Sequence, residues 1–134
     1  MRGQVALEYM LIFAFSLAAL GILWYYSSAN IDDARWDIQL AYAKSAMSKI
    51  AEVSELSYLQ GPPAQFYVYP NFPDNVKNVY ITANSITFEM KWKAILRNVS
   101  LETVANIAGS LGNYQGVHKI LVKALDGSVQ ISEG

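Results

Sequence analysis

The side chains that could do chemistry in this chain are few. His118 is the only histidine, and cysteine is absent. Acyl transfer by a serine nucleophile would need a base beside a strained turn, and no Gly-x-Ser-x-Gly elbow occurs. A single histidine next to Lys119 in a strand-like segment is typical of a surface or half-buried position. We therefore expect no catalytic role for His118.

Two further patterns fall short of a binding site. Residues 109–112 (GSLG) lack the lysine of a phosphate-binding loop. Asp32, Asp33 and Asp37 could attract a cation weakly, but a solvated helix face accounts for them equally well. The net charge of −1, without a basic cluster, argues against nucleic acid as a partner. The sequence thus predicts no enzyme, no cofactor and no metal site.

The most unusual carboxylate is Glu8, the only charged residue of the apolar stretch 4–26 (QVALEYMLIFAFSLAALGILWYY). As a helix this stretch would measure about 35 Å, which is enough to cross a bilayer. A carboxylate at mid-membrane costs about 2.5–3.5 kcal/mol on insertion scales, although near a helix end it can reach the interface. Glu8 is therefore either a tolerated edge residue or a residue with a partner.

The apolar stretch has more than one interpretation. A cleaved secretory signal peptide carries an apolar run of about 7–15 residues, and this run is longer. It ends in Trp24, Tyr25 and Tyr26, which suit the membrane interface. A single-pass membrane anchor is the second interpretation. The third is suggested by the residues that open the stretch.

Arg2-Gly3, followed by residues 4–10 (QVALEYM), resembles the class III signal peptide of archaeal type IV pilins, and adhesion pilins more than archaellins. In that family a short basic leader ends in glycine, and a prepilin peptidase cuts after it. The resemblance implies a leader of residues 1–3, cleavage between Gly3 and Gln4, and retention of the apolar helix. Tyr9 completes the Gln-x-x-x-Glu-Tyr pattern of the mature start.

The resemblance also implies what Glu8 does. After cleavage it would be the fifth mature residue, able to pair with the Gln4 amine of its own or a neighbouring subunit. Opposite charges attract strongly in a dry core, which offsets part of their desolvation. The implied function is a structural subunit of an archaeal type IV pilus-like surface filament, for adhesion or attachment.

The implied partners and locations follow from the same resemblance. The precursor would lie in the cytoplasmic membrane, and the mature protein would form an extracellular homopolymer through helix packing. A prepilin peptidase and a pilus assembly ATPase with its platform would act on it. A membrane-anchored surface binding protein, or a minor pilin outside the filament body, remains open.

The helix is expected to continue beyond the apolar stretch. Apolar or small residues recur at steps of three and four, which indicates one buried face of an amphipathic helix. They are Ile31, Ala34, Ile38, Ala41, Ala46, Ile50, Val53 and Leu56. Because Gly61-Pro62-Pro63 cannot continue a helix, we expect one long helix over residues 4–60.

After Pro63 the apolar period changes from about 3.6 to 2, which indicates strands. Strands are expected at 65–69, 76–82, 85–95, 117–125 and 128–132. Residues 83–84 and 126–127 are expected to be hairpin turns. Residues 101–111 have helical spacing, but glycines oppose a long helix, and the resemblance favours a strand or loop. The predicted fold class is α+β: a long hydrophobic and amphipathic N-terminal helix, then a small antiparallel β-sheet or sandwich head over 64–134.

Asn98-Val99-Ser100 is an acceptor triplet for glycosylation. Such triplets also arise by chance, but this one follows an expected strand on a chain expected to be exported. The resemblance implies that surface filament proteins of this kind are frequently glycosylated. We predict that Asn98 lies on the exposed surface of the head and carries a glycan.

Overall fold

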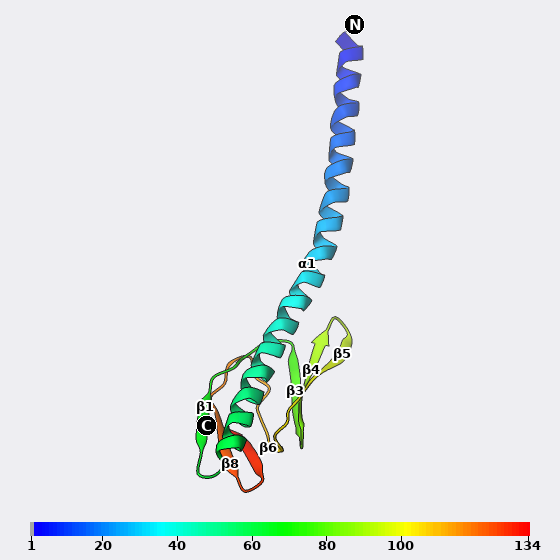
Figure 1. Cartoon of the computed structure of the whole chain (residues 1–134). Helices are drawn as coiled ribbons and strands as arrows, with labels where there is room; N and C mark the ends of the chain where they lie inside the picture. The colour runs from blue at the N-terminus through cyan, green and yellow to red at the C-terminus, as the bar shows by residue number, and fades with distance from the viewer. Residues whose placement is uncertain (1) are drawn as a thin grey trace. The chain divides into compact units, whose positions relative to one another are not determined.

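The computed structural model describes residues 2–134, in which a single long helix precedes nine short strands (Figure 1). Helix α1 runs over Arg2–Gln60 and has 59 residues. The chain divides into two compact units, with the boundary between Asp37 and Ile38, inside α1. A long helix followed by mostly antiparallel strands confirms the α+β class.

The first unit consists of the beginning of α1. Every side chain over 2–35 is exposed, and the helix is uninterrupted over 27–33, where the chain has no glycine or proline. Ser16 and Ser28 turn their hydroxyls back to the backbone, donating to the carbonyls of Ile12 at 2.8 Å and Tyr25 at 3.0 Å. These bonds satisfy the two hydroxyl donors within the helix itself.

In the second unit one face of α1 is buried. The buried residues are mostly small and follow steps of three and four: Ala43, Ala46, Met47, Ile50, Ala51, Ser54 and Ser57. The expected stripe was right at Ala46 and Ile50 but wrong at Ile38, Ala41 and Leu56, which are exposed. Small residues let a helix backbone come close to a sheet, so the face that packs here is not the one with the bulkiest apolar residues.

The end of α1 has the geometry that its sequence predicts. Gly61 has a φ of +70°, a conformation that costs glycine little, and its N–H donates to the carbonyl of Ser57 at 3.0 Å. The helix therefore stops at Gln60, and the chain turns into the first strand.

The strands form two main sheets. Their bounds are β1 Gln65–Val68, β2 Asn71–Phe72, β3 Val76–Thr82, β4 Ser85–Trp92, β5 Ile95–Glu102, β6 Ile107–Gly109, β7 Gly116–Val117, β8 Ile120–Leu125 and β9 Ser128–Glu133. One sheet has the order β1-β8-β9-β6, another has the order β3-β4-β5, and β2 pairs with β7. Only the β6–β9 pair is parallel among the strand pairs that the structure describes.

Several expected strands have different bounds. The hairpin turns at 83–84 and 126–127 are confirmed, because Thr82 pairs with Ser85 and Leu125 with Ser128. The expected strand 85–95 instead ends at Trp92, and β5 returns antiparallel to it. The turn between them uses Lys93 at a φ of 54°, where glycine or asparagine is the usual residue, so no turn motif marks it in the sequence.

Two other segments complete the comparison. The expected strand 117–125 is interrupted at residues 118–119, between β7 and β8. Residues 101–111 comprise the end of β5, a loop and β6, which confirms the expectation of strand or loop rather than helix.

The core of the second unit is aromatic and branched. Along β4 buried residues alternate with more exposed ones, so that Ile86, Phe88 and Met90 face inward. The rings of Phe72 and Phe88 meet inside at 4.9 Å between centroids. Buried residues of β8 and β9 add Ile120, Val122, Val129 and Ile131. The strands and the buried face of α1 thus share one core.

Candidate functional site

The first candidate site is the exposed apolar segment of α1, residues 4–26. Phe15 is 73% exposed and Trp24 is 79% exposed, and their large apolar neighbours are similarly open. The helix is long and apolar enough to cross a membrane, and its most apolar window is unburied. The core helix of a soluble protein would bury such a window. Soluble monomers rarely leave contiguous apolar patches larger than a few hundred Å² exposed, so this surface calls for lipid or protein around it.

The residues of the expected cleavage and assembly sites lie at the start of this segment or just before it. Gln4, Glu8 and Tyr9 are exposed, and Gln4 and Glu8 are four residues apart, so they share one helix face. A side chain added at Gly3 would meet nothing within 4 Å. Met1, the first residue of the expected leader, lies outside the described residues.

Small residues mark one side of the same segment. Ala14, Ala18 and Gly21 follow steps of four and three, which places them on a common face. A Cβ at Gly21 would also meet nothing within 4 Å. Nothing in the described chain fills the space beside this face, and small residues there would let another helix come close.

The expected glycosylation residue, Asn98, is exposed as predicted. It lies within β5 rather than after a strand, because the strand expected to end at Ile95 is in fact a hairpin. Asn98 pairs with Glu89 across the sheet and shares its face with Leu96 and Ser100, away from the buried residues of β4. Its modification stays a prediction.

His118 corrects the expectation of a surface or half-buried residue, because its side chain is fully buried. Its ring stacks between Phe72 and Tyr114, with centroid distances of 3.9 and 3.8 Å. Nδ1 lies 2.6 Å from Glu133 Oε1, and Nε2 lies 2.6 Å from the carbonyl oxygen of Tyr114. The histidine thus joins the loop before it to the last strand. Glu133 is 15 residues away in sequence, and the partner at Tyr114 is a backbone oxygen. No local sequence pattern could therefore identify either partner.

The direction of one His118 hydrogen bond follows from its partner. A carbonyl oxygen only accepts, so Nε2 donates to Tyr114. Nδ1 faces the carboxylate of Glu133, which also accepts a hydrogen bond from Gly112 N at 3.2 Å. Desolvation, then the charge of Glu133 and a hydrogen bond to it, raises the pKa of the Tyr114 hydroxyl. These contacts are all internal, which fits a structural role.

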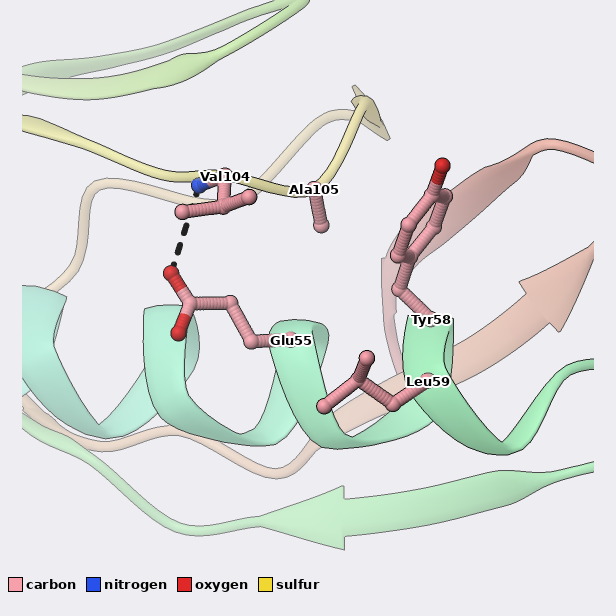
Figure 2. Close-up of a pocket in the computed structure, with 5 residues that line it drawn as sticks. All are labelled: Glu55, Tyr58, Leu59, Val104 and Ala105. Carbon is pink, nitrogen blue, oxygen red and sulfur yellow. Dashed lines mark hydrogen bonds between the residues drawn. The ribbon is translucent and has the colours of Figure 1, made fainter.

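The second candidate site is an apolar groove of about 230 Å³ between the last turns of α1 and the loop after β5 (Figure 2). It is lined by Glu55, Tyr58, Leu59, Val104 and Ala105. Leu59 and Val104 are more than four-fifths exposed, at 81% and 85%. Glu55 Oε1 accepts a hydrogen bond from Val104 N at 3.3 Å, which ties the two walls together. The sequence did not predict this groove, since its walls are 49 residues apart.

Among residues 2–134, no group of three or more acidic or histidine side chains is placed to hold a metal ion. Comparison with protein-family models, with curated proteins and with solved structures gives no significant match.

Proposed function

We propose that this protein is the structural subunit of an archaeal type IV pilus-like surface filament, which polymerises through residues 4–26. One observation carries the proposal: an exposed apolar helix with a single carboxylate precedes a unit that has a core of its own. Such a helix can lie in lipid as a precursor and among copies of itself in a filament. The Arg2-Gly3 motif before Gln4 supports it.

The driving force would not be the hydrophobic effect alone. Moving an apolar helix from lipid into a protein bundle changes its apolar surroundings little, so packing and polar contacts must supply the gain. The face of Ala14, Ala18 and Gly21 permits close packing. Pairing of Glu8 with a Gln4 amine and contacts between heads would add to it. An assembly ATPase and its platform would supply the work of extraction.

A second candidate is a membrane-anchored surface protein that binds a partner and never polymerises. The same exposed helix supports it, as do Trp24, Tyr25 and Tyr26, which suit the membrane interface at the end of the apolar stretch. The two candidates differ in processing, because an anchor needs no cut before Gln4.

The test is electron microscopy of filaments purified from the surface of the native organism, with mass spectrometry of their N-terminus. We expect filaments whose subunits begin at Gln4. Gly3→Val should block the cut because a branched side chain replaces the small residue at the bond, whereas Ala6→Val, a similar change beyond the cut, should not. A surface protein that retains Arg2-Gly3, in cells without filaments, would favour the anchor.

We also propose that Asn98 carries a glycan in the native organism. Its exposure on the outer face of β5 supports this. Peptide mass spectrometry of native material should find added mass on the peptide with Asn98 and none on the peptide with Asn106, which is exposed but lacks the triplet. An unmodified Asn98 would remove the claim.

A further inference from the structure

Two exposed patches of the second unit lie at opposite ends of strand β5. The first, here called the knob, comprises residues 91–97, the turn between β4 and β5 with its flanks (Figure 1). The second is the groove of Glu55, Tyr58, Leu59, Val104 and Ala105 (Figure 2). Each combines apolar surface with charge, and the charges are opposite.

The knob is basic and apolar. Ile95 is 58% exposed and Leu96 is 55% exposed, and Trp92 beside them is half-buried. Its charged residues are all cationic: Lys91, Lys93 and Arg97. The amine of Lys93 lies 5.4 Å from the centroid of the Trp92 ring, so charge and aromatic surface are presented together.

The groove is apolar with an acidic edge. Leu59 and Val104 contribute open apolar walls, and Glu55 lies at the rim. Glu52 is exposed on the same helix, three residues before Glu55, and adds a second carboxylate on that side. Its volume of about 230 Å³ is below the ~300–1,000 Å³ of typical small-molecule sites, so it suits one or two protein side chains.

The knob cannot reach the groove of its own chain. Thr103 N donates to the carbonyl of Asn84 at 2.7 Å, which places the groove loop at the β3–β4 turn. That turn is at the opposite end of the sheet from the β4–β5 turn, because β4 and β5 pair along their whole lengths. At about 3.3 Å per residue, β5 separates Ile95 from Val104 by roughly 30 Å. Any contact must be made with another molecule.

We propose that the knob of one molecule docks in the groove of a second copy of this chain. Opposite charge and matching apolar surface argue for this occupant, and both patches are present on every copy. A contact between two different patches is heterologous, so it leaves one knob and one groove free and can propagate into a filament. The inference rests on the proposed filament function and assigns the head contact within it.

A glycan on Asn98 would not block this contact. In β5, Ile95 shares the sheet face of Trp92, whereas Asn98 shares the face of Glu89. Side chains alternate along a strand, so these two faces point in opposite directions. Docking through Trp92 and Ile95 leaves Asn98 on the other side.

The absence of cysteine makes a direct test possible. Ile95→Cys with Val104→Cys, in the full-length chain in its native host, should form disulfides between molecules under oxidation of intact cells. We expect a ladder of dimers and higher multimers on a non-reducing gel. Ile95→Cys with Gln130→Cys, which places the second thiol at an exposed position of β9, is the matched control and should give at least tenfold less.

Filament counts in the same cells separate this inference from the proposed function. Filaments with a ladder for the 95/104 pair alone support both. Filaments without that ladder, or with an equal ladder for the control, overturn the head contact and leave the filament standing. A ladder without filaments supports the contact and overturns the filament function. Neither ladder nor filaments overturns both.

A charge exchange tests the electrostatic part. Lys93→Glu or Glu52→Lys, each added to the 95/104 cysteine pair, should reduce the ladder severalfold because like charges would then meet; Lys93 is the cation that lies over the Trp92 ring on the docking face. Both substitutions together should restore it. Two single changes without effect, or a double variant as poor as the singles, would contradict the assignment of opposite charges to this contact.

Discussion

The two parts of helix α1 differ in where their apolar side chains lie. Up to Asp37 the helix carries large apolar residues that are exposed on all sides, with Phe15 and Trp24 as examples. From Ile38 onward it buries one face of mostly small residues, and its other faces expose polar residues with a few apolar ones such as Leu59. The second part packs its buried face against the strands of the same chain. No such contact covers the first part within the described residues, and its exposed apolar surface is compatible with lipid around it.

The largest effect is expected at the one charge of the first part. If Glu8 pairs with a Gln4 amine between subunits, Glu8→Ala leaves that amine buried and unpaired, at about 3–5 kcal/mol. Since about 1.4 kcal/mol corresponds to a factor of ten, subunit affinity should fall more than a hundredfold. Filaments counted by electron microscopy should be few or absent, and processed protein should accumulate in the membrane fraction.

The control for Glu8→Ala is Asp32→Ala, which removes an exposed carboxylate from the same helix beyond the apolar stretch. It should leave filament numbers unchanged. Glu8→Gln should behave like Glu8→Ala, because it keeps the shape and loses the charge. Normal filament numbers with Glu8→Ala would defeat the pairing mechanism, and unchanged or improved surface display would fit an anchor.

The next largest effect is expected on the stability of the second unit, when the same substitution is made in each part of the helix. Ile50 is fully buried and Ile22 is 64% exposed. Ile50→Ala leaves a cavity and should destabilise the second unit by about 2–5 kcal/mol, whereas Ile22→Ala should change its stability by less than about 0.5 kcal/mol. Hydrogen exchange of the β8 and β9 amides, on the full chain in detergent micelles, measures both. Equal effects would contradict the contrast between the two parts.

Sequence patterns identified the first part of α1 better than the second. The composition of an exposed apolar segment is enough to identify it. Local sequence patterns likewise predict the single helix, its end at Gly61 and the hairpin at Asp126-Gly127. The buried face of the second part depends on which residues let the helix come close to strands that follow in sequence. The expected stripe was therefore right at Ala46 and Ile50 but wrong at Leu56, and it missed Ala43 and Ser54.

The features of the head that were missed share a cause. The environment of His118 is made by Phe72, Tyr114 and Glu133, which the fold brings together from separate strands and loops. The β4–β5 turn at Lys93 uses a residue that is not typical of its conformation. In both cases the tertiary structure determines the surroundings or the conformation of the residue, and the local sequence pattern does not predict them.

A smaller effect is expected at Glu133, which holds the buried histidine of the second unit. Glu133→Gln removes the charge of the 2.6 Å contact with Nδ1 but keeps a polar group there. Glu133 is partly exposed, so we expect a loss of about 1–2 kcal/mol in the free energy of unfolding. Glu102→Gln, an exposed carboxylate on β5, is the control and should be neutral. Equal stability of the two variants would mean that the His118 contact contributes nothing.

The smallest effect is expected at two serines on the buried face of α1. Ser54 and Ser57 are both fully buried. Ser54 Oγ donates to the carbonyl of Ile50 at 2.7 Å, whereas Ser57 Oγ has no hydrogen-bond partner among residues 2–134. The two serines therefore allow a comparison between a hydroxyl that makes a hydrogen bond and one that does not. They lie three residues apart on the buried face that only the second part of the helix has.

Replacing either serine with alanine should help the helix by a few tenths of a kcal/mol, through propensity. At Ser54 the lost bond offsets this gain, because a typical hydrogen bond contributes about 0.5–1.5 kcal/mol. At Ser57 there is no bond to lose, and removing a buried unpaired hydroxyl adds to the gain. Ser57→Ala should therefore be more stable than Ser54→Ala by about 1 kcal/mol, measured by hydrogen exchange at the β8 and β9 amides. Equal stabilities would show that the hydroxyl of Ser57 is bonded after all, by a water molecule that reaches this face of the helix.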